Sequence, residues 1–169
     1  MELKTYFVIG VNGIGKTTTL EVLKELLPED SFALYDFDQR GVPDGAGKEW
    51  RKAETKYWIS LGELNKQDQK QTIIFGFAKP EEIEEMALDL DSKPIMILLD
   101  ANVSTVTERI KSRYAREDSV KELLRTTGKS VEKFIEDNIY YSNLLRELRF
   151  LHNFKVINTT GRTPTEISA

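Results

Sequence analysis

Residues 6–20, YFVIGVNGIGKTTTL, combine an apolar run, a glycine-rich loop and the beginning of an amphipathic segment. The part from Gly10 to Thr17, GVNGIGKT, fits the spacing G-x-x-x-x-G-K-S/T at every fixed position. Glycines at this spacing let successive backbone N–H groups turn inward and form a concave site for phosphate oxygens. The stretch therefore predicts a strand, a phosphate-binding loop and a helix whose positive N-terminal end faces the same phosphates.

The phosphate-binding loop indicates a nucleoside triphosphate ligand, and we expect ATP together with Mg²⁺. In this motif Lys16 is placed to reach the β- and γ-phosphates, and the hydroxyl of Thr17 is placed to hold the metal ion. The residues expected to bind nucleotide in this loop are Gly10, Asn12, Gly13, Ile14, Gly15, Lys16, Thr17 and Thr18.

Beyond the loop, apolar runs of strand length alternate with segments of helical periodicity. The runs are almost continuous in apolar residues, which is typical of strands buried on both faces of a parallel sheet. We expect five strands, at residues 5–10, 32–37, 72–77, 95–100 and 154–158. Helices between them should cover both faces of the sheet, so the sequence predicts one α/β domain over residues 1–169.

Two connections are longer than the fold requires. Residues 39–48 are rich in glycine and follow the second strand, and residues 112–130 are rich in charge and follow the fourth helix. Long loops at the carboxyl edge of an α/β sheet commonly carry the chemistry. We therefore expect residues 39–70 to bind an acceptor molecule and residues 112–130 to form a charged loop over the site.

Two fragments favour a GTPase at first sight, because residues 38–41 fit D-x-x-G and residues 65–68 fit N-K-x-D. The guanine-reading N-K-x-D should follow a buried strand, yet here it lies at the end of an expected helix and precedes the third strand. We therefore interpret residues 65–68 as a polar helix end.

An acidic pair ends the second strand, where Asp36 and Asp38 flank Phe37. Residues two apart on a strand face the same way, so both carboxylates should face the phosphate loop across the sheet edge. One could orient or deprotonate an acceptor hydroxyl, and the other could support Mg²⁺. We expect Asp38 to act on the hydroxyl and Asp36 to lie on the metal side, although the sequence leaves the two roles exchangeable.

In its order of elements the chain resembles the small P-loop kinases of the shikimate-kinase, gluconate-kinase and adenylate-kinase group. Asp36-Phe37-Asp38 matches the D-x-D turn of these families, and Arg109 and Arg113 match their R-x-x-x-R. The resemblance implies a three-layer P-loop NTPase fold with strand order 2-3-1-4-5.

The same resemblance implies roles for residues outside the loop. Arg109 would stack on adenine, while Arg113 and Arg116 would reach the phosphates from a mobile lid. The segment NTTGRTP would cup adenine through Arg162 and Pro164. On physical grounds, guanidinium groups stabilise charge on a transferring phosphoryl group, and a closing lid excludes water.

The chain departs from nucleoside monophosphate kinases at the third strand. Phe75 stands where these enzymes carry an aspartate, and Lys79 where they carry an arginine. The acceptor region offers Arg40 and Arg51 as its arginines, which are the candidates for binding an acceptor.

An acceptor that is an alcohol needs a carboxylate, which the Asp36 and Asp38 pair supplies. We therefore expect an ATP-dependent phosphotransferase acting on a hydroxyl of a small molecule or nucleoside. The alternatives are a nucleoside monophosphate kinase and a non-catalytic ATP-binding switch.

The overall composition narrows the function classes further. The net charge is −4 and basic residues are spread along the chain, which disfavours nucleic acid or a membrane surface as partner. The absence of cysteine excludes disulfides and thiolate chemistry and suits the cytoplasm, where we expect the protein. The sequence carries no signal for oligomeric state.

Overall fold

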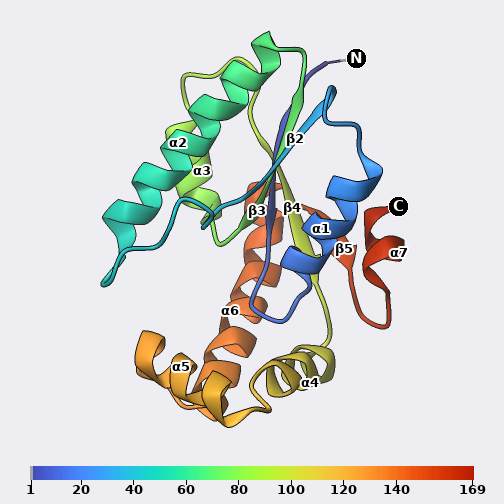
Figure 1. Ribbon diagram of the computed structural model, residues 1–169. Coiled ribbons are helices and arrows are strands. Elements are labelled where there is room, and N and C mark those ends of the chain that lie inside the picture. Colours follow the sequence, from blue (N-terminus) through green and yellow to red (C-terminus); the bar gives the residue numbers. More distant parts are fainter. Residues whose placement is uncertain (1) are drawn as a thin grey trace.

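The strand before the phosphate loop lies at the centre of a five-stranded parallel sheet in the computed structural model, which describes residues 2–169. The strand order is β2-β3-β1-β4-β5, which confirms the expected three-layer fold and its order (Figure 1). The strands are β1 (Thr5–Ile9), β2 (Phe32–Asp36), β3 (Gln71–Gly76), β4 (Ile95–Asp100) and β5 (Lys155–Asn158).

Helices connect the strands and cover both faces of the sheet. In Figure 1, α1 and α7 lie together on one side of the sheet and α2 and α3 together on the other, while α6 packs against β4. The helices are α1 (Lys16–Leu26), α2 (Lys48–Gln67), α3 (Pro80–Met86), α4 (Val103–Arg113), α5 (Glu117–Thr127), α6 (Val131–His152) and α7 (Pro164–Ser168).

The burial of the sheet follows from this order. Phe7, Val8 and Ile9 on the central strand are each at most 4% exposed, as expected for a strand with neighbours on both sides and helices on both faces. All strands point the same way, so their carboxyl ends meet at one edge. The phosphate loop after β1 therefore shares that edge with the ends of β2, β3, β4 and β5.

The segment of residues 112–130 differs from expectation, because it contains the helix α5 rather than a continuous loop. Its charges lie at helical spacing: Lys121 pairs with Glu117, and Arg125 pairs with Glu122. Such pairs support a helix rather than oppose it. Gly128 ends the helix in the left-handed conformation, at φ 69°. We call residues 112–130 the lid segment.

The end of α2 explains the N-K-x-D fragment. Asn65 is buried on the last turns of α2, and its side-chain amide donates to the hydroxyl of Thr72 at 2.9 Å. Asp68 follows as the residue that ends the helix. The fragment is a helix end packed on the sheet, as expected from its position. Within residues 2–169, every helix is too short or too polar to cross a lipid bilayer.

Candidate functional site

The loop between β1 and α1 has the backbone that its glycines predict. Gly13 has φ 77° and Gly15 has φ 106°, both in the left-handed region that side chains disfavour. A Cβ atom on Gly13 would lie 2.9 Å from Cγ1 of Ile110 on α4, so the loop also passes too close to that helix for a side chain. The loop turns directly into α1, whose first residue is Lys16.

Lys16 folds inward over the loop that carries it. Its ammonium group donates to the carbonyl oxygens of Gly10 at 2.8 Å and Val11 at 2.9 Å. Burial lowers the pKa of Lys16 to about 8, against the opposing pull of the Asp36 and Asp38 carboxylates. The site therefore holds a partly desolvated cation facing two acids.

A cleft of about 810 Å³ opens at this edge of the sheet and collects most of the residues singled out from the sequence. Those it brings together are Asn12, Gly13, Gly15, Lys16, Thr17, Thr18, Asp36, Asp38, Arg109, Arg113, Arg162 and Pro164. The other lining residues are Thr19, Phe75, Gly76, Phe77 and Ile167. The predicted Gly10 and Ile14 support the loop from beneath: Gly10 receives the Lys16 ammonium, and Ile14 is 1% exposed.

The acidic pair lies at the end of β2, where the chain turns. A carboxylate oxygen of Asp36 accepts the backbone N–H of Asp38 at 2.9 Å, which closes the turn around the buried Phe37. Loss of hydration raises the pKa of Asp38, and the negative charge of Asp36 raises it further, while Lys16 opposes both. A carboxylate with a raised pKa is a better proton acceptor, as a general base requires.

Phe37 sits at the centre of this turn and fixes it. Its backbone carbonyl accepts the indole N–H of the buried Trp58 at 3.1 Å, and its ring meets Trp50 edge-on at 6.1 Å. Gly76 at the end of β3 makes room for it, because a Cβ atom there would lie 2.2 Å from that of Phe37. The two acids are therefore held by packing between β2, β3 and α2.

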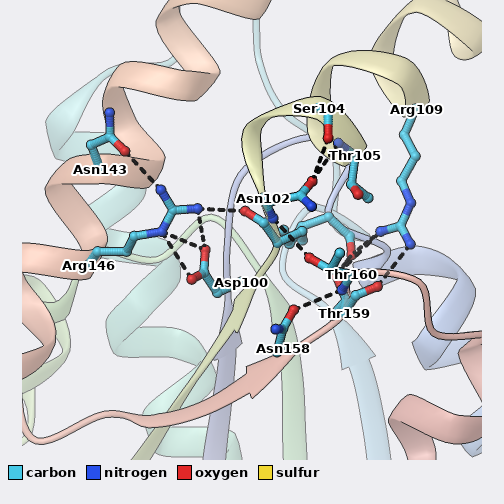
Figure 2. Close-up of polar contacts among 12 residues, drawn as sticks. Asp100, Asn102, Ser104, Thr105, Arg109, Asn143, Arg146, Asn158, Thr159 and Thr160 are labelled. Atoms are coloured by element: carbon cyan, nitrogen blue, oxygen red, sulfur yellow. Dashed lines mark hydrogen bonds and ion pairs between the residues drawn. The ribbon is translucent and has the colours of Figure 1, made fainter.

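Arg109 braces the loop from α4. Its guanidinium donates to the backbone carbonyl of Ile14 at 3.1 Å and to that of Thr159 at 3.1 Å, and Figure 2 shows it reaching from α4 to the chain after β5. Asn102 starts α4 by accepting the N–H of Thr105, and its own N–H donates to the hydroxyl of Thr160. These contacts set α4 against the segment that carries Arg162 and Pro164.

The two arginines predicted to act from the lid segment differ in position, because Arg113 lines the cleft and Arg116 does not. Arg113, the last residue of α4, lines the cleft and is close enough to Lys16 to oppose its charge. Arg116 precedes α5 at the N-cap position, its side chain is exposed, and it is not among the residues that line the cleft. Its approach to the phosphates stays a prediction that requires the lid segment to move.

The two arginines of the acceptor region, Arg40 and Arg51, form ion pairs with glutamates outside the cleft lining. Arg51 forms a two-pronged pair with Glu82, with both N–O distances at 2.7 Å, and the Glu82 side chain is 3% exposed. Arg40 donates to Glu54 at 3.1 Å and lies over the ring of Tyr57 at 3.7 Å. Neither lines the cleft, so their binding of an acceptor stays a prediction.

A further acid ends β4, but its partner lies on α6. Figure 2 shows Arg146 holding the carboxylate of Asp100, with its Nε 3.0 Å from each oxygen and a terminal nitrogen 2.8 Å from one of them. The same guanidinium donates to the side chain of Asn143 at 2.8 Å. A shallower hollow of about 460 Å³ beside this pair is separate from the main cleft. Asp100 therefore ties the sheet to α6 and is not among the residues that line the main cleft.

Sequence reasoning did not assign several contributors to the site, among them Phe75, Phe77 and Asn138. Phe75 and Phe77 line the cleft from the end of β3, although the sequence showed only that no acid stands there. Asn138 on α6 touches the phosphate loop through its side chain. The continuous apolar run of β3 could have placed Phe75 near the strand end, but no local signal marks Asn138, which lies 126 residues from its partner.

Comparison with solved structures finds the same fold in several kinases. The chain is similar to shikimate kinase from Acinetobacter baumannii, with 18% identity over 98% of this chain and 89% of that one, and a TM-score of 0.59. A gluconokinase from Sinorhizobium meliloti 1021 gives 15% identity over 98% and 87% of the chains and a TM-score of 0.56. Thymidylate kinase from Candida albicans is 11% identical over 98% of this chain and 88% of that one, with a TM-score of 0.53.

No protein-family model matches the chain, and no curated protein matches it in sequence. The likeness therefore lies in the fold, which is that of the small P-loop kinases, as the sequence resemblance implied.

Proposed function

We propose that the protein is a kinase that transfers the γ-phosphoryl group of ATP to a hydroxyl of a small molecule or nucleoside. One observation carries the proposal: Lys16, which follows β1, and the pair Asp36 and Asp38 at the end of β2 line one cleft. A phosphate-binding cation and a proton-accepting acid are the two groups that transfer to an alcohol requires.

The residues present suit ATP and Mg²⁺. Mg²⁺ in phosphoryl-transfer sites is held by one or two carboxylates together with phosphates and water, so it needs no protein cage. Residues 2–169 contain no cluster of three His, Cys, Asp or Glu side chains that could hold a metal ion alone, and Thr17 with Asp36 supplies the smaller set. When bound, Mg²⁺ would neutralise charge on the β- and γ-phosphates.

Each residue then has a role in the transfer. The acceptor hydroxyl gives its proton to Asp38 as its oxygen bonds to the γ-phosphorus, and the bond between that phosphorus and the bridging oxygen of ADP breaks. Lys16 and Arg113 stabilise the negative charge on the oxygens of the γ-phosphoryl group during its transfer. Arg116 would join them from the lid segment, while Arg109, Arg162 and Pro164 would hold the adenine end.

An acceptor that is itself a phosphate is the second candidate, since a thymidylate kinase shares the fold. Such an acceptor needs cations beside the acids. Arg40 and Arg51 are paired with Glu54 and Glu82 and lie outside the cleft lining, which favours an alcohol instead.

The test is a screen of the purified protein for ADP release from Mg-ATP. The panel would contain sugars, sugar acids, cyclic polyols, nucleosides and nucleoside monophosphates, and Asp38→Asn protein would serve as the control for background hydrolysis. We expect at least one alcohol to raise ADP release well above the rate without acceptor. Turnover restricted to monophosphates would replace the proposal with the second candidate, and ATP binding without turnover on any acceptor would favour a switch.

A further inference from the structure

Asn138 on α6 is hydrogen-bonded to the phosphate loop, and the proposed mechanism makes no use of it. The residue is 7% exposed, and its side-chain oxygen accepts the backbone N–H of Asn12 at 2.8 Å and the side-chain amide of the same residue at 3.3 Å. Its own amide nitrogen donates to the carbonyl of Phe134 at 2.7 Å. These contacts leave one orientation for the Asn138 amide, with its oxygen toward the loop.

The hydrogen bond from the Asn12 N–H to Asn138 sets the orientation of the whole peptide unit between Val11 and Asn12. That N–H belongs to the same peptide unit as the carbonyl of Val11, and the carbonyl accepts the ammonium of Lys16 at 2.9 Å. A trans peptide is planar, and its N–H and C=O point in opposite directions. Asn138 and Lys16 therefore hold the two ends of one rigid unit, and rotation of that unit would remove both contacts.

We propose that Asn138 is a positioning residue that fixes the Val11–Asn12 peptide and thereby holds the phosphate loop and Lys16 ready for a nucleoside triphosphate. The inference rests on the proposed function in one respect, since it requires that the loop bind ATP. Preorganised donors bind better because the cost of ordering them has been met before the ligand arrives. Without Asn138 the peptide keeps only the bonds at its carbonyl end, so it is less firmly ordered and part of the binding energy goes into ordering the loop.

The position of Asn138 also links the loop to the rest of the cleft. One turn earlier on α6, the Phe134 ring meets Tyr114 edge-on at 5.7 Å, at the start of the lid segment. One turn later, Tyr141 packs against Phe77 of the cleft wall at 5.0 Å. The helix that anchors the loop thus also contacts the lid segment and the part of the cleft wall formed by Phe77.

The first experiment measures binding of a fluorescent ATP analogue with Mg²⁺, in the absence of any acceptor. Asn138→Leu keeps the volume but removes the hydrogen bonds, and we expect affinity to fall about tenfold, the size of one well-formed hydrogen bond. The matched control is Asn65→Leu, which removes an equally buried helical asparagine whose partners, Thr72 and Tyr35, lie away from the loop. Both variants should melt at lower temperature, but Asn65→Leu should bind with wild-type affinity.

A double-mutant cycle tests the path through Lys16. If Asn138 acts on the nucleotide through the shared peptide, Asn138→Leu should weaken binding much less in protein that already carries Lys16→Ala. An equal penalty in both backgrounds would overturn that path. Wild-type affinity in Asn138→Leu protein, or an equal loss in Asn65→Leu protein, would overturn the positioning role itself.

The outcomes are separable from those of the kinase proposal. Binding is read without turnover, so failure to find an acceptor leaves the inference standing while the proposed reaction fails. Failure of the wild-type protein to bind the analogue would reject both.

Discussion

The side of the cleft proposed to bind nucleotide, here the nucleotide side, and the side proposed to bind the acceptor, here the acceptor side, are built in different ways. On the nucleotide side, the loop after β1 takes its shape from glycines at Gly13 and Gly15 and presents backbone groups. On the acceptor side, acids at the end of β2 are held by packing of Phe37 between β3 and α2, and the nearby arginines are locked in pairs with Glu54 and Glu82. The phosphate loop and the acidic turn can each be recognised from a short motif, whereas the contacts between separate elements that hold the acids and pair the arginines cannot.

The largest expected effect is the loss of turnover on substitution of Asp38, which should affect the acceptor side and leave ATP binding on the nucleotide side intact. Asp38→Asn should lower turnover by about 10³-fold, since a positioned general base contributes that much, while ATP affinity stays nearly unchanged. Steady-state kinetics with the identified acceptor and titration with an ATP analogue provide the two readouts. Asp44→Asn, an exposed acid in the connection after β2, serves as the control. Equal losses of turnover and of ATP affinity in Asp38→Asn protein would assign Asp38 to the fold rather than to the chemistry.

The second prediction concerns the paired arginine on the acceptor side. Arg51→Leu leaves the carboxylate of Glu82 buried without its partner, which should lower the free energy of unfolding by about 3 kcal/mol. Denaturant titration measures this loss, and ATP affinity should be unaffected under conditions where the variant is folded. Lys52→Ala breaks the neighbouring, more exposed pair with Glu85 between the same two helices and should cost much less. Similar costs for both variants would contradict a buried structural role for Arg51.

The third prediction compares the two lid arginines. Arg113→Ala should lower turnover by about 100-fold, because its guanidinium lines the cleft and can stabilise charge on the transferring group. Arg116→Ala should also lower turnover more than nucleotide affinity, by a smaller factor that depends on closure of the lid segment. Pre-steady-state kinetics would separate closure from chemistry. Unchanged turnover in Arg116→Ala protein would remove this residue from the mechanism.

The smallest expected effect is the uptake of a fraction of a proton by Lys16 when the nucleotide binds. Burial lowers the pKa of Lys16 to about 8, so near and above that pH part of the nucleotide-free protein carries a neutral amine. Bound phosphates favour the ammonium, so binding should take up a fraction of a proton, and affinity should fall as pH rises through 8. Calorimetry in buffers with different ionisation enthalpies measures the uptake. Lys16→Arg, whose guanidinium stays charged, should abolish it, and a persistent uptake in that variant would assign the proton to another group.

Most of the architecture was predictable because its signals are local. Apolar runs located all five strands to within one or two residues, and the strand order followed from the resemblance to small P-loop kinases. The capping box at Thr163 and Glu166, which starts α7, is a local signal of the same kind. The helix α5 was missed because a high density of charge was interpreted as a loop, although the opposite charges were spaced to pair along a helix.

The chain sequence alone was enough to define the phosphate loop, the acids after β2 and the fold that brings them to one edge. These depend on backbone conformation and on the periodicity of apolar residues, which neighbours along the chain specify. Folding in three dimensions was needed to pair Arg51 with Glu82 and to bring Asn138 against Asn12. Such contacts join residues far apart in the chain, and their energies depend on burial and distance that no local pattern records.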